Sequence, residues 1–316
     1  MSALKSKNKE MKDIFSNLPV RGRVKFMEPM RNHTSLRMGG PADIFIIPQD
    51  LPSLKIILER LTKCEIPFFI IGGGTNILVK DGGIEGAVIS LRAFRRFETM
   101  RREASCIYVN VEAGASLQKL VFYCREEGYS GIEGLAGIPG TAGGAIFGNA
   151  GAFGYEMKDV IVSLETVNDR GEVNLRKAEE IDFGYRRSGI SGHETVFRAE
   201  MRFRPDKKEY VSERIEGFLK KKRRSQPLCE HSAGCVFRNP PGCFAGKLIE
   251  ESGCKGMKYG GVEVSSVHAN FFVNKGGARA SDFMTLMNKV SRKVYEKFGI
   301  VLEPEINIVG REPVNG

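Results

Sequence analysis

The sequence lacks paired cysteine motifs and long hydrophobic runs. Its seven cysteines are odd in number and scattered, with no CxxC, which argues against a disulfide scaffold and indicates a reducing compartment. Apolar runs such as IPFFII (66–71) are far too short to cross a bilayer. The N-terminal MSALKSKNKEMKD has no apolar core of a signal peptide. We therefore expect a cytoplasmic protein without a membrane partner.

Internal repeats and low-complexity linkers are also absent. The 316 residues suffice for two or three closely packed domains. The formal net charge of +10 favours anionic partners, which include nucleic acid and phosphorylated small molecules. Nucleic-acid binding has no aromatic-basic platform or recognition motif to support it. An anionic small molecule accounts for the same charge.

Apolar spacing predicts a charged lead-in (1–30) followed by three units that mix helices and strands. The first two units, ending near residues 95 and 205, have one helix each, whose apolar residues recur at helical spacing. The helix of the first unit begins after Asp50, and that of the second runs from the cap Ser116 to Gly128. The predicted strands are 67–71, 86–91, 107–115 and 194–205, with a hairpin around NDRG (168–171).

The third unit begins with a charged helix over about 206–224 and closes with a helix from Ser281 to Gly299. The first of these helices ends in the basic run 220–224. Such a run is usually a solvated face, and here it would attract phosphate through its field rather than through any one lysine.

Two glycine-rich tracts carry the strongest functional signal. GGGTN (72–76) follows a predicted buried strand, and glycine lets the backbone approach a phosphate closely. Its spacing is not GxGxxG and ILVK after it is strand-like, so a Rossmann fingerprint fails and a plain β-turn is an equal alternative. The tract 134–154 is too rich in glycine for a regular helix or strand interior, and too apolar for a flexible linker. Two such tracts predict one extended ligand with a pyrophosphate and a ring system.

Seven ordered motifs make the chain resemble the UDP-N-acetylenolpyruvoylglucosamine reductases, flavoenzymes of bacterial cell-wall precursor synthesis. The resemblance covers about residues 30–310. The chain is similar to the shorter of the family's two subtypes, because no insertion follows FGYRRS. The motifs are HTSLRMGGPAD (33–43), GGGTNILV (72–79), GIPGTAGGAIFGNAGAFG (137–154), FGYRRS (183–188), GCVFRNP (234–240), HANFFVN (268–274) and LEPEI (302–306).

The resemblance implies an α+β fold with a two-subdomain FAD-binding part (31–95 and 96–205), of the type shared with vanillyl-alcohol oxidases. A third α+β domain (206–300) would bind the substrate, and a C-terminal strand and tail (301–316) would carry a catalytic glutamate. NADPH would pass hydride to FAD, which would pass it to the enolpyruvyl methylene carbon of UDP-N-acetylglucosamine enolpyruvate. A proton at the adjacent carbon would complete the lactyl ether of UDP-N-acetylmuramate. No metal is implied, and the oligomeric state stays open, a monomer being compatible.

The resemblance also implies the site residues. The catalytic ones are Arg186, Cys235 and Glu305. Those that bind the cofactor are Gly72, Gly73, Gly74, Thr75, Asn76, Gly137, Ile138, Pro139, Gly140, Thr141, Gly144, Asn149 and Gly151. Those that bind the substrate are Tyr185, Arg238, Asn239 and His268. An alcohol or lactone oxidase on the same scaffold is the alternative, but it would not need GCVFRNP and LEPEI.

Cys235 departs from the resemblance, because the family usually has a serine there as proton donor. A free thiol has a reference pKa of about 8.5, so it is mostly protonated near neutral pH and suits an acid. The alternatives are a small buried hydrophobe and a metal site with Cys229, His231 and Cys243. The spacing of these four residues lacks the paired geometry of structural zinc sites.

Arg186 and Glu305 each have a neighbouring competitor. In a strand, Arg186 and Arg187 would face opposite sides, and the resemblance selects Arg186. Glu303 and Glu305 would share one face of a strand, opposite Leu302, Pro304 and Ile306, and the resemblance selects Glu305. Pro304 favours a strand edge or an irregular stretch.

Overall fold

The computed structural model describes residues 15 and 18–313, and these divide into two compact units. The first unit contains the described residues up to Met27, Asp43–Gly73 and Gly86–Leu219. The second contains Glu28–Ala42, Gly74–Glu85 and the described residues from Lys220 onward. Among the residues described, no helix is both long and apolar enough to cross a membrane.

The N-terminal part of the first unit builds a four-stranded sheet with one helix, α2 (Leu51–Lys63). The strand order is β1 (Gly22–Pro29), β2 (Pro41–Pro48), β5 (Ile84–Ser90) and β3 (Phe68–Ile71), and β3 and β5 run parallel. The predicted start of the helix is confirmed, because the Asp50 carboxylate accepts a hydrogen bond from the Ser53 amide at 2.9 Å.

Strand β1 corrects the expectation of a charged lead-in over residues 1–30, of which residues 1–14, 16 and 17 lie outside the described part of the chain. Val24 and Phe26 are half-buried and pack against the core, whereas Arg23 and Lys25 between and beside them are exposed. This alternation has the period of a strand, and the surrounding charges masked it in the sequence.

A larger antiparallel sheet follows in the same unit. Its order is β12 (Val173–Lys177), β11 (Ile161–Asn168), β13 (Glu194–Pro205), β7 (Ile107–Glu112) and β6 (Phe97–Arg102), with β8 (Tyr129–Ser130) paired to β13. The predicted strands at 107–115 and 194–205 and the hairpin around 168–171 are therefore confirmed. Helix α3 (Leu117–Glu127) also begins at the predicted cap, Ser116, and ends at Gly128, whose φ is +69°.

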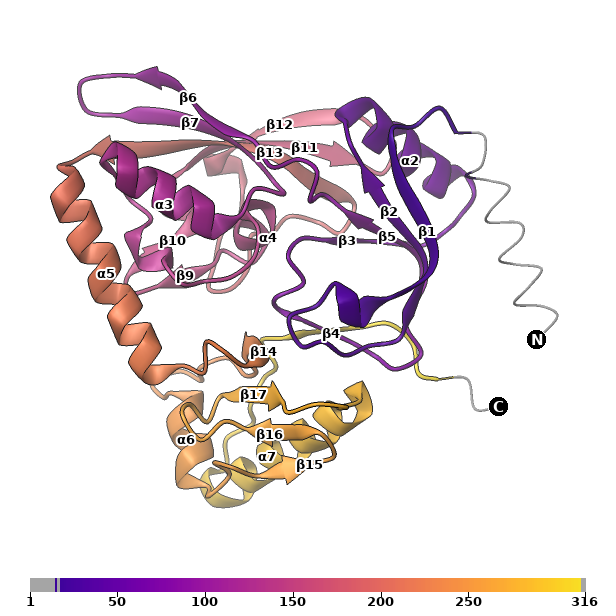
Figure 1. The fold of residues 1–316 in the computed structure, drawn as a ribbon, viewed down its shortest axis with the longest axis vertical. Helices are drawn as coiled ribbons and strands as arrows, with labels where there is room; N and C mark the ends of the chain where they lie inside the picture. The colour runs from indigo at the N-terminus through magenta and orange to yellow at the C-terminus, as the bar shows by residue number, and fades with distance from the viewer. Residues whose placement is uncertain (1–14, 16–17, 314–316) are drawn as a thin grey trace. The chain divides into compact units, whose positions relative to one another are not determined.

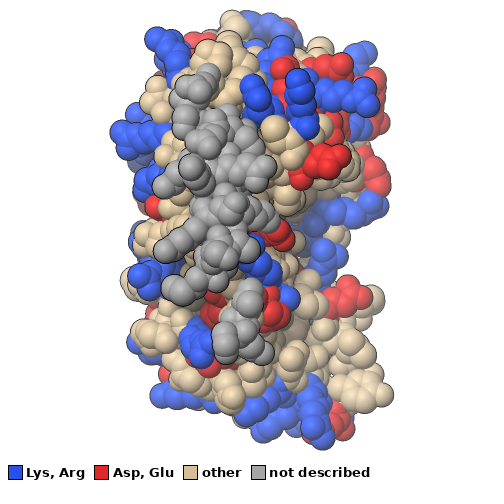
Figure 2. Space-filling view, turned by 90° about the vertical axis from the view of Figure 1, so that its right-hand side faces the viewer, with Lys and Arg blue, Asp and Glu red and all other residues tan. Residues whose placement is uncertain are grey.

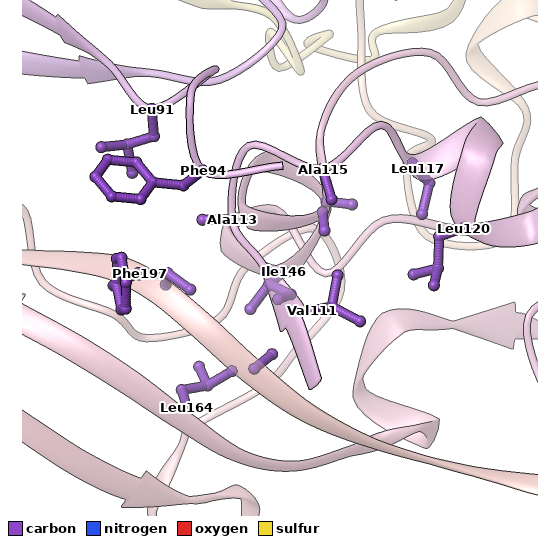
Figure 3. Close-up of a cluster of buried hydrophobic side chains, with 14 of the residues drawn as sticks. Leu91, Phe94, Val111, Ala113, Ala115, Leu117, Leu120, Ile146, Leu164 and Phe197 are labelled. Carbon is purple, nitrogen blue, oxygen red and sulfur yellow. The ribbon is translucent and has the colours of Figure 1, made fainter. Parts of the chain in front are cut away.

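The core of the first unit joins this sheet to its helices. Figure 1 shows α3 and α4 (Ala142–Phe147) on one face of the sheet. The close-up in Figure 3 shows Val111 of β7, Ile146 of α4 and Leu120 of α3 among these buried side chains. Phe94 and Phe197 meet edge to face, with ring centroids 5.1 Å apart. Burial of each such large side chain contributes about 1.5–3 kcal/mol.

Helix α4 corrects the expectation that the second glycine tract holds no regular structure. Thr141 caps it by accepting a hydrogen bond from the Gly144 amide, and Ala142, Ala145 and Ile146 are buried. A Cβ on Gly143 would lie 2.7 Å from the Cβ of Ala113, so the glycine allows close packing of the helix. Strand β9 (Gly151–Ala152) at the end of the tract pairs with β10 (Tyr155–Glu156) directly after it. The first unit also contains three short 3-10 turns, η2 (Glu133–Leu135), η3 (Met157–Asp159) and η4 (Ala178–Glu180).

The second unit contains a four-stranded antiparallel sheet and two helices. The order is β14 (His231–Cys235), β17 (Phe271–Asn274), β16 (Val262–Val264) and β15 (Lys258–Tyr259). Helix α7 (Ala280–Phe298) packs against β15 and β16 and contacts α6 (Ala245–Glu251). The predicted end of α7 at Gly299 is confirmed.

Two further segments complete this unit. Strand β4 (Ile77–Val79), directly after GGGTN, pairs in parallel with the C-terminal strand β18 (Asn307–Val309), and the turn η1 is Met30–Asn32. Helix α5 (Lys208–Ser225) matches the charged helix expected over 206–224, and the division between the two units falls within it, after Leu219.

Candidate functional site

The two glycine tracts meet within the first unit. A Cβ added to Gly72 would lie 2.5 Å from the Thr141 hydroxyl oxygen and 3.7 Å from the Cα of Gly144. Only glycine therefore fits at position 72, and the backbone of one tract lies against the other. This arrangement fits a flat extended ligand such as FAD, which would be held largely by backbone groups.

Gln118 holds the GIPG loop of the second tract, and the sequence reasoning missed it. The Gln118 side chain accepts a hydrogen bond from the Gly137 amide at 2.7 Å and donates to the Ile138 carbonyl at 2.6 Å. A weaker bond at 3.3 Å reaches the Leu135 carbonyl. The one available signal was an amide side chain in the first turn of the predicted helix, directly after the apolar Leu117.

Arg186 lies at the tip of a tight turn, not in the strand expected from FGYRRS. Gly184 and Arg187 exchange backbone hydrogen bonds, at 2.9 and 3.3 Å, and Arg186 between them has a φ of +57°. The turn, rather than the alternation of a strand, therefore gives the two arginine side chains different partners. Arg187 pairs with Asp182 and is 58% exposed, whereas Nη1 of Arg186 donates to the Gly151 carbonyl at 3.0 Å.

Arg186 lines a pocket of about 350 Å³ in the first unit. Tyr185, Glu156 and Lys158 line the same pocket, and the Tyr185 ring lies 5.4 Å from the Arg186 guanidinium carbon. Lys158 hydrogen-bonds Glu156 at 2.8 Å, and this bond is the main cause that lowers the pKa of Glu156. An Asn149 hydrogen bond and the charge of Arg186 also lower it, against the opposing effect of burial. The pocket thus joins two cations to an ionised carboxylate.

Cys235 ends β14, directly after an irregular step in its pairing with β17. Gly234 before it has a φ of +79°, which favours glycine. Asn270, buried to 2% exposure, fixes the chain after Cys235: it accepts from the Phe237 amide at 2.9 Å and donates to the Phe237 carbonyl at 2.7 Å. The sequence reasoning missed Asn270, although an amide directly before the apolar residues FFV (271–273) was a signal.

The backbone of Glu305 is bonded to that of Val236, the residue after Cys235. The Glu305 amide donates to the Val236 carbonyl at 2.8 Å, and the Arg238 amide donates to the Glu303 carbonyl at 2.9 Å. The expected strand over LEPEI is wrong, because only Pro304 forms an isolated bridge, with Phe237, and β18 begins at Asn307. Pro304 is exposed instead of sharing the buried side with Leu302 and Ile306, which agrees with the irregular stretch that proline favours.

Asn76 of the first glycine tract is tied to the same segment. Its side chain donates to the Glu305 carbonyl at 3.2 Å, and its own carbonyl accepts from the Asn307 amide at 3.0 Å. Cys235, Glu305 and Asn76 belong to the second unit, whereas Arg186 and the tract 134–154 belong to the first.

The remaining predicted substrate residues lie near these segments. In the part of the chain that the structure describes, the buried Nε of Arg238 has no hydrogen-bond partner, which suits an anionic ligand. Asn239, by contrast, has a partner within the protein: its side-chain oxygen accepts a hydrogen bond from the Ala245 amide at the start of α6. Burial lowers the pKa of His268, whose Nδ1 accepts from the Asn270 amide at 3.2 Å.

The structure also describes the basic run 220–224 and the cysteines considered as metal ligands. Lys222 is buried to 3% exposure, although its neighbours Lys220, Lys221, Arg223 and Arg224 are exposed. Basic and acidic side chains are interspersed on the face drawn in Figure 2. Among the described residues no group of three or more His, Cys, Asp or Glu is arranged to hold a metal, and all seven cysteines are free.

Comparison with known proteins agrees with this arrangement. Residues 42–175 match the FAD binding domain, and residues 226–309 match the C-terminal domain of UDP-N-acetylenolpyruvoylglucosamine reductase. The reductase of Geotalea uraniireducens is 40% identical over 92% of this chain and 95% of its own length. That of Alkaliphilus oremlandii is 41% identical over 90% and 93%.

A solved structure extends the likeness to the fold. The crystal structure of the Thermus caldophilus UDP-N-acetylenolpyruvylglucosamine reductase matches with a TM-score of 0.78 and 34% identity, over 92% of this chain and 99% of that one. The predicted α+β FAD-binding fold is therefore confirmed. The chain belongs to the family of UDP-N-acetylenolpyruvoylglucosamine reductases.

Proposed function

We propose that this protein reduces the enolpyruvyl ether of UDP-N-acetylglucosamine enolpyruvate to UDP-N-acetylmuramate, with NADPH as hydride donor. Likeness to reductases over more than nine-tenths of the chain supports this reaction. The enzyme is an FAD-containing oxidoreductase of peptidoglycan precursor synthesis. The free cysteines support a cytoplasmic location.

FAD would be held by the predicted cofactor residues of the two glycine tracts, with the exception of the Asn149 side chain, which hydrogen-bonds Glu156, Gly184 and Lys158 instead. Gln118 would keep the GIPG loop in place. When bound, FAD supplies a carrier for the hydride between NADPH and the substrate. The close packing of Gly72 against Thr141 supports this assignment, because both tracts contribute to one backbone surface. The subdomain boundaries near residues 95 and 205 are part of the same proposal.

The chain's own side chains would manage the charge and the proton of the reaction. Hydride addition to the methylene carbon pushes negative charge onto the substrate carboxylate, and the Arg186 guanidinium would stabilise it. The Cys235 thiol would donate the proton to the adjacent carbon, and Glu305 would orient the intermediate. Tyr185, Arg238, Asn239 and His268 would contact the UDP-sugar, and the basic end of α5 would attract its diphosphate.

One observation carries the catalytic assignment: the hydrogen bond from the Glu305 amide to the Val236 carbonyl, which ties the segments of the proposed acid and carboxylate together. These segments come from GCVFRNP and LEPEI, so their adjacency supports the reductase over an alcohol or lactone oxidase. In the proposed reductase, NADPH and the UDP-sugar account for the positive charge, and a monomer would suffice.

The test is a two-step assay of purified, yellow holoenzyme. NADPH should bleach the flavin absorbance, and UDP-N-acetylglucosamine enolpyruvate should restore it without oxygen, with one lactyl ether formed per NADPH. Reduction of the flavin by alcohols or lactones, with no response to the enolpyruvyl sugar, would refute the proposal in favour of the oxidase.

A further inference from the structure

We propose that Asn149 is a positioning residue for Arg186, which it holds through the turn that carries the arginine. The inference rests on the proposed function, in which Arg186 acts on the substrate. Asn149 lies in the second glycine tract, 37 positions before Arg186 in the printed sequence, and both residues belong to the first unit.

Asn149 is buried to 1% exposure, and both the nitrogen and the oxygen of its side-chain amide form hydrogen bonds within the protein. Its amide nitrogen donates to the Gly184 carbonyl and to Oε2 of Glu156, each at 3.0 Å. Its oxygen accepts from the Lys158 amide at 3.1 Å. Both amide protons are therefore used, which favours a role inside the protein over direct contact with the cofactor.

The turn that carries Arg186 needs outside support. A non-glycine residue at φ +57° is uncommon and costs about 1–3 kcal/mol unless its surroundings hold it. Gly184, which accepts from Asn149, is also the residue that closes the turn with Arg187. The Arg186 side chain in turn donates to the carbonyl of Gly151, two residues after Asn149. One short segment, 149–151, thus holds both the base of the turn and its arginine.

Backbone strain is concentrated at this place. Six non-glycine residues of the described chain have positive φ, and three of them are Asn149 (+39°), Phe153 (+55°) and Arg186. Strain of this kind persists where the surrounding structure over-determines a geometry, as at functional sites.

Charge supports the same arrangement. Glu156 shares its Oε2 between Asn149 and Lys158 and lines the pocket with Arg186. Asn149 therefore fixes a carboxylate that faces the guanidinium, as well as the backbone of the turn. Displacement of a reacting group by about 1 Å can lower a rate by about a hundredfold.

The experiment is a double-mutant cycle on the holoenzyme, with Asn149→Ala, Arg186→Ala and the double variant. Asn149→Ala should slow substrate-dependent flavin reoxidation by about 10- to 100-fold, and leave flavin content and flavin reduction by NADPH within about twofold. When Arg186 is already replaced by alanine, the further change Asn149→Ala should slow reoxidation by less than about twofold, because Asn149 acts through the arginine that is then missing.

Asn168→Ala is the matched control. Asn168 also bonds a nearby glutamate, Glu172, and the backbone of a turn, but in the hairpin of β11 and β12. It should change neither half-reaction. If Asn149→Ala folds poorly, Asn149→Asp keeps the shape, loses both donors and sets a carboxylate against Glu156, so the same non-additive loss is expected.

Additive losses in the cycle, or loss of flavin in Asn149→Ala, would overturn the inference. Hydrogen exchange distinguishes a failure of the positioning role of Asn149 from a failure of the proposed reaction. The hydrogen-exchange rate of the Gly184 amide should rise about fivefold in Asn149→Ala and stay unchanged in Asn168→Ala, and this holds whether or not the wild-type enzyme reduces the UDP-sugar. Unchanged exchange at Gly184 would refute the positioning role, whereas an inactive wild type would refute the proposed reaction.

Discussion

The carboxylate of Asp81 accepts hydrogen bonds from the backbone amide of Ser281 at 3.0 Å and from that of Ala280 at 2.8 Å. Asp81 thus satisfies the first amides of α7 from a loop about two hundred positions earlier in the chain. Negative charge at this end of a helix is stabilising, because the unpaired amides carry partial positive charge. The relationship joins the segment after GGGTN to the longest helix of the second unit.

Asp81→Ala should lower the free energy of unfolding by about 1–2 kcal/mol, the usual cost of a lost cap. Urea unfolding of the wild type and the variant at one pH measures this. Glu296→Ala is the control, because Glu296 pairs with Arg292 on the exposed side of the same helix and should cost less than about 0.5 kcal/mol. Equal losses in the two variants would contradict the capping role.

The same carboxylate gives a pH dependence. Burial acts to raise the pKa of Asp81, but hydrogen bonds from Ser281 and Ala280 outweigh it, and the net pKa is lowered from 3.8. Its stabilisation is therefore complete above about pH 4 and is lost as the pH falls through the lower folded-state pKa. Asp81→Ala should flatten the acid side of the stability curve, measured by urea midpoints between neutral pH and about pH 3.

Gln118→Ala should weaken flavin binding without unfolding the protein. The variant loses the bonds to the Gly137 amide and the Ile138 carbonyl, worth about 1 kcal/mol each. We expect a rise of about tenfold in the dissociation constant of FAD, since 1.4 kcal/mol corresponds to a factor of ten. Titration of apoprotein by flavin fluorescence measures it. Lys119→Ala, at the exposed neighbouring position, should bind FAD like the wild type, and a Gln118 variant that does so as well would disprove the role.

The sequence predicted elements whose signals are local. Helices α2 and α3 carry their caps, Asp50 and Ser116, next to apolar residues at helical spacing, so the first residue of each helix was predictable. The turn of Arg186 was not, because it is held by Asn149 and Gly151, more than thirty positions away. A positive φ at arginine has no local signature.

The candidate site shows the same division. The resemblance selected Cys235 and Glu305 as candidates, and these assignments stay predictions. The segment LEPEI was wrongly predicted as a strand, because its partner is the segment after Cys235 rather than a regular neighbouring strand. The sheet β14–β17 was missed because its strands are at most five residues long and β15 has two. Gln118 and Asn270 were missed because a single amide side chain does not reveal from sequence which backbone it will bond.

His268 should make stability fall on the acid side of neutrality. Burial lowers its pKa from 6.5, so the unfolded chain takes up a proton that the folded one resists. Stability is therefore highest above about pH 6.5 and declines as the pH drops toward the lower folded-state value. His268→Gln should reduce this decline in urea unfolding between pH 7.5 and about 5. His231→Gln, at an exposed position, should keep it; a decline that survives in His268→Gln would mean that another group is responsible.

Cys235→Ala should separate the two half-reactions. Loss of a positioned acid lowers a rate by about 10²–10⁴-fold, so substrate-dependent flavin reoxidation should fall by that factor while flavin reduction by NADPH stays intact. Cys235→Ser should restore turnover, because a hydroxyl can take the place of the thiol as proton donor. The thiol is half-buried, so iodoacetamide should inactivate the wild type and spare Cys235→Ser, which retains the other six cysteines as an internal control. Stopped-flow absorbance follows both steps. Loss of both half-reactions in Cys235→Ala would assign Cys235 a packing role, and an inactive serine variant would show that the proton comes from another group.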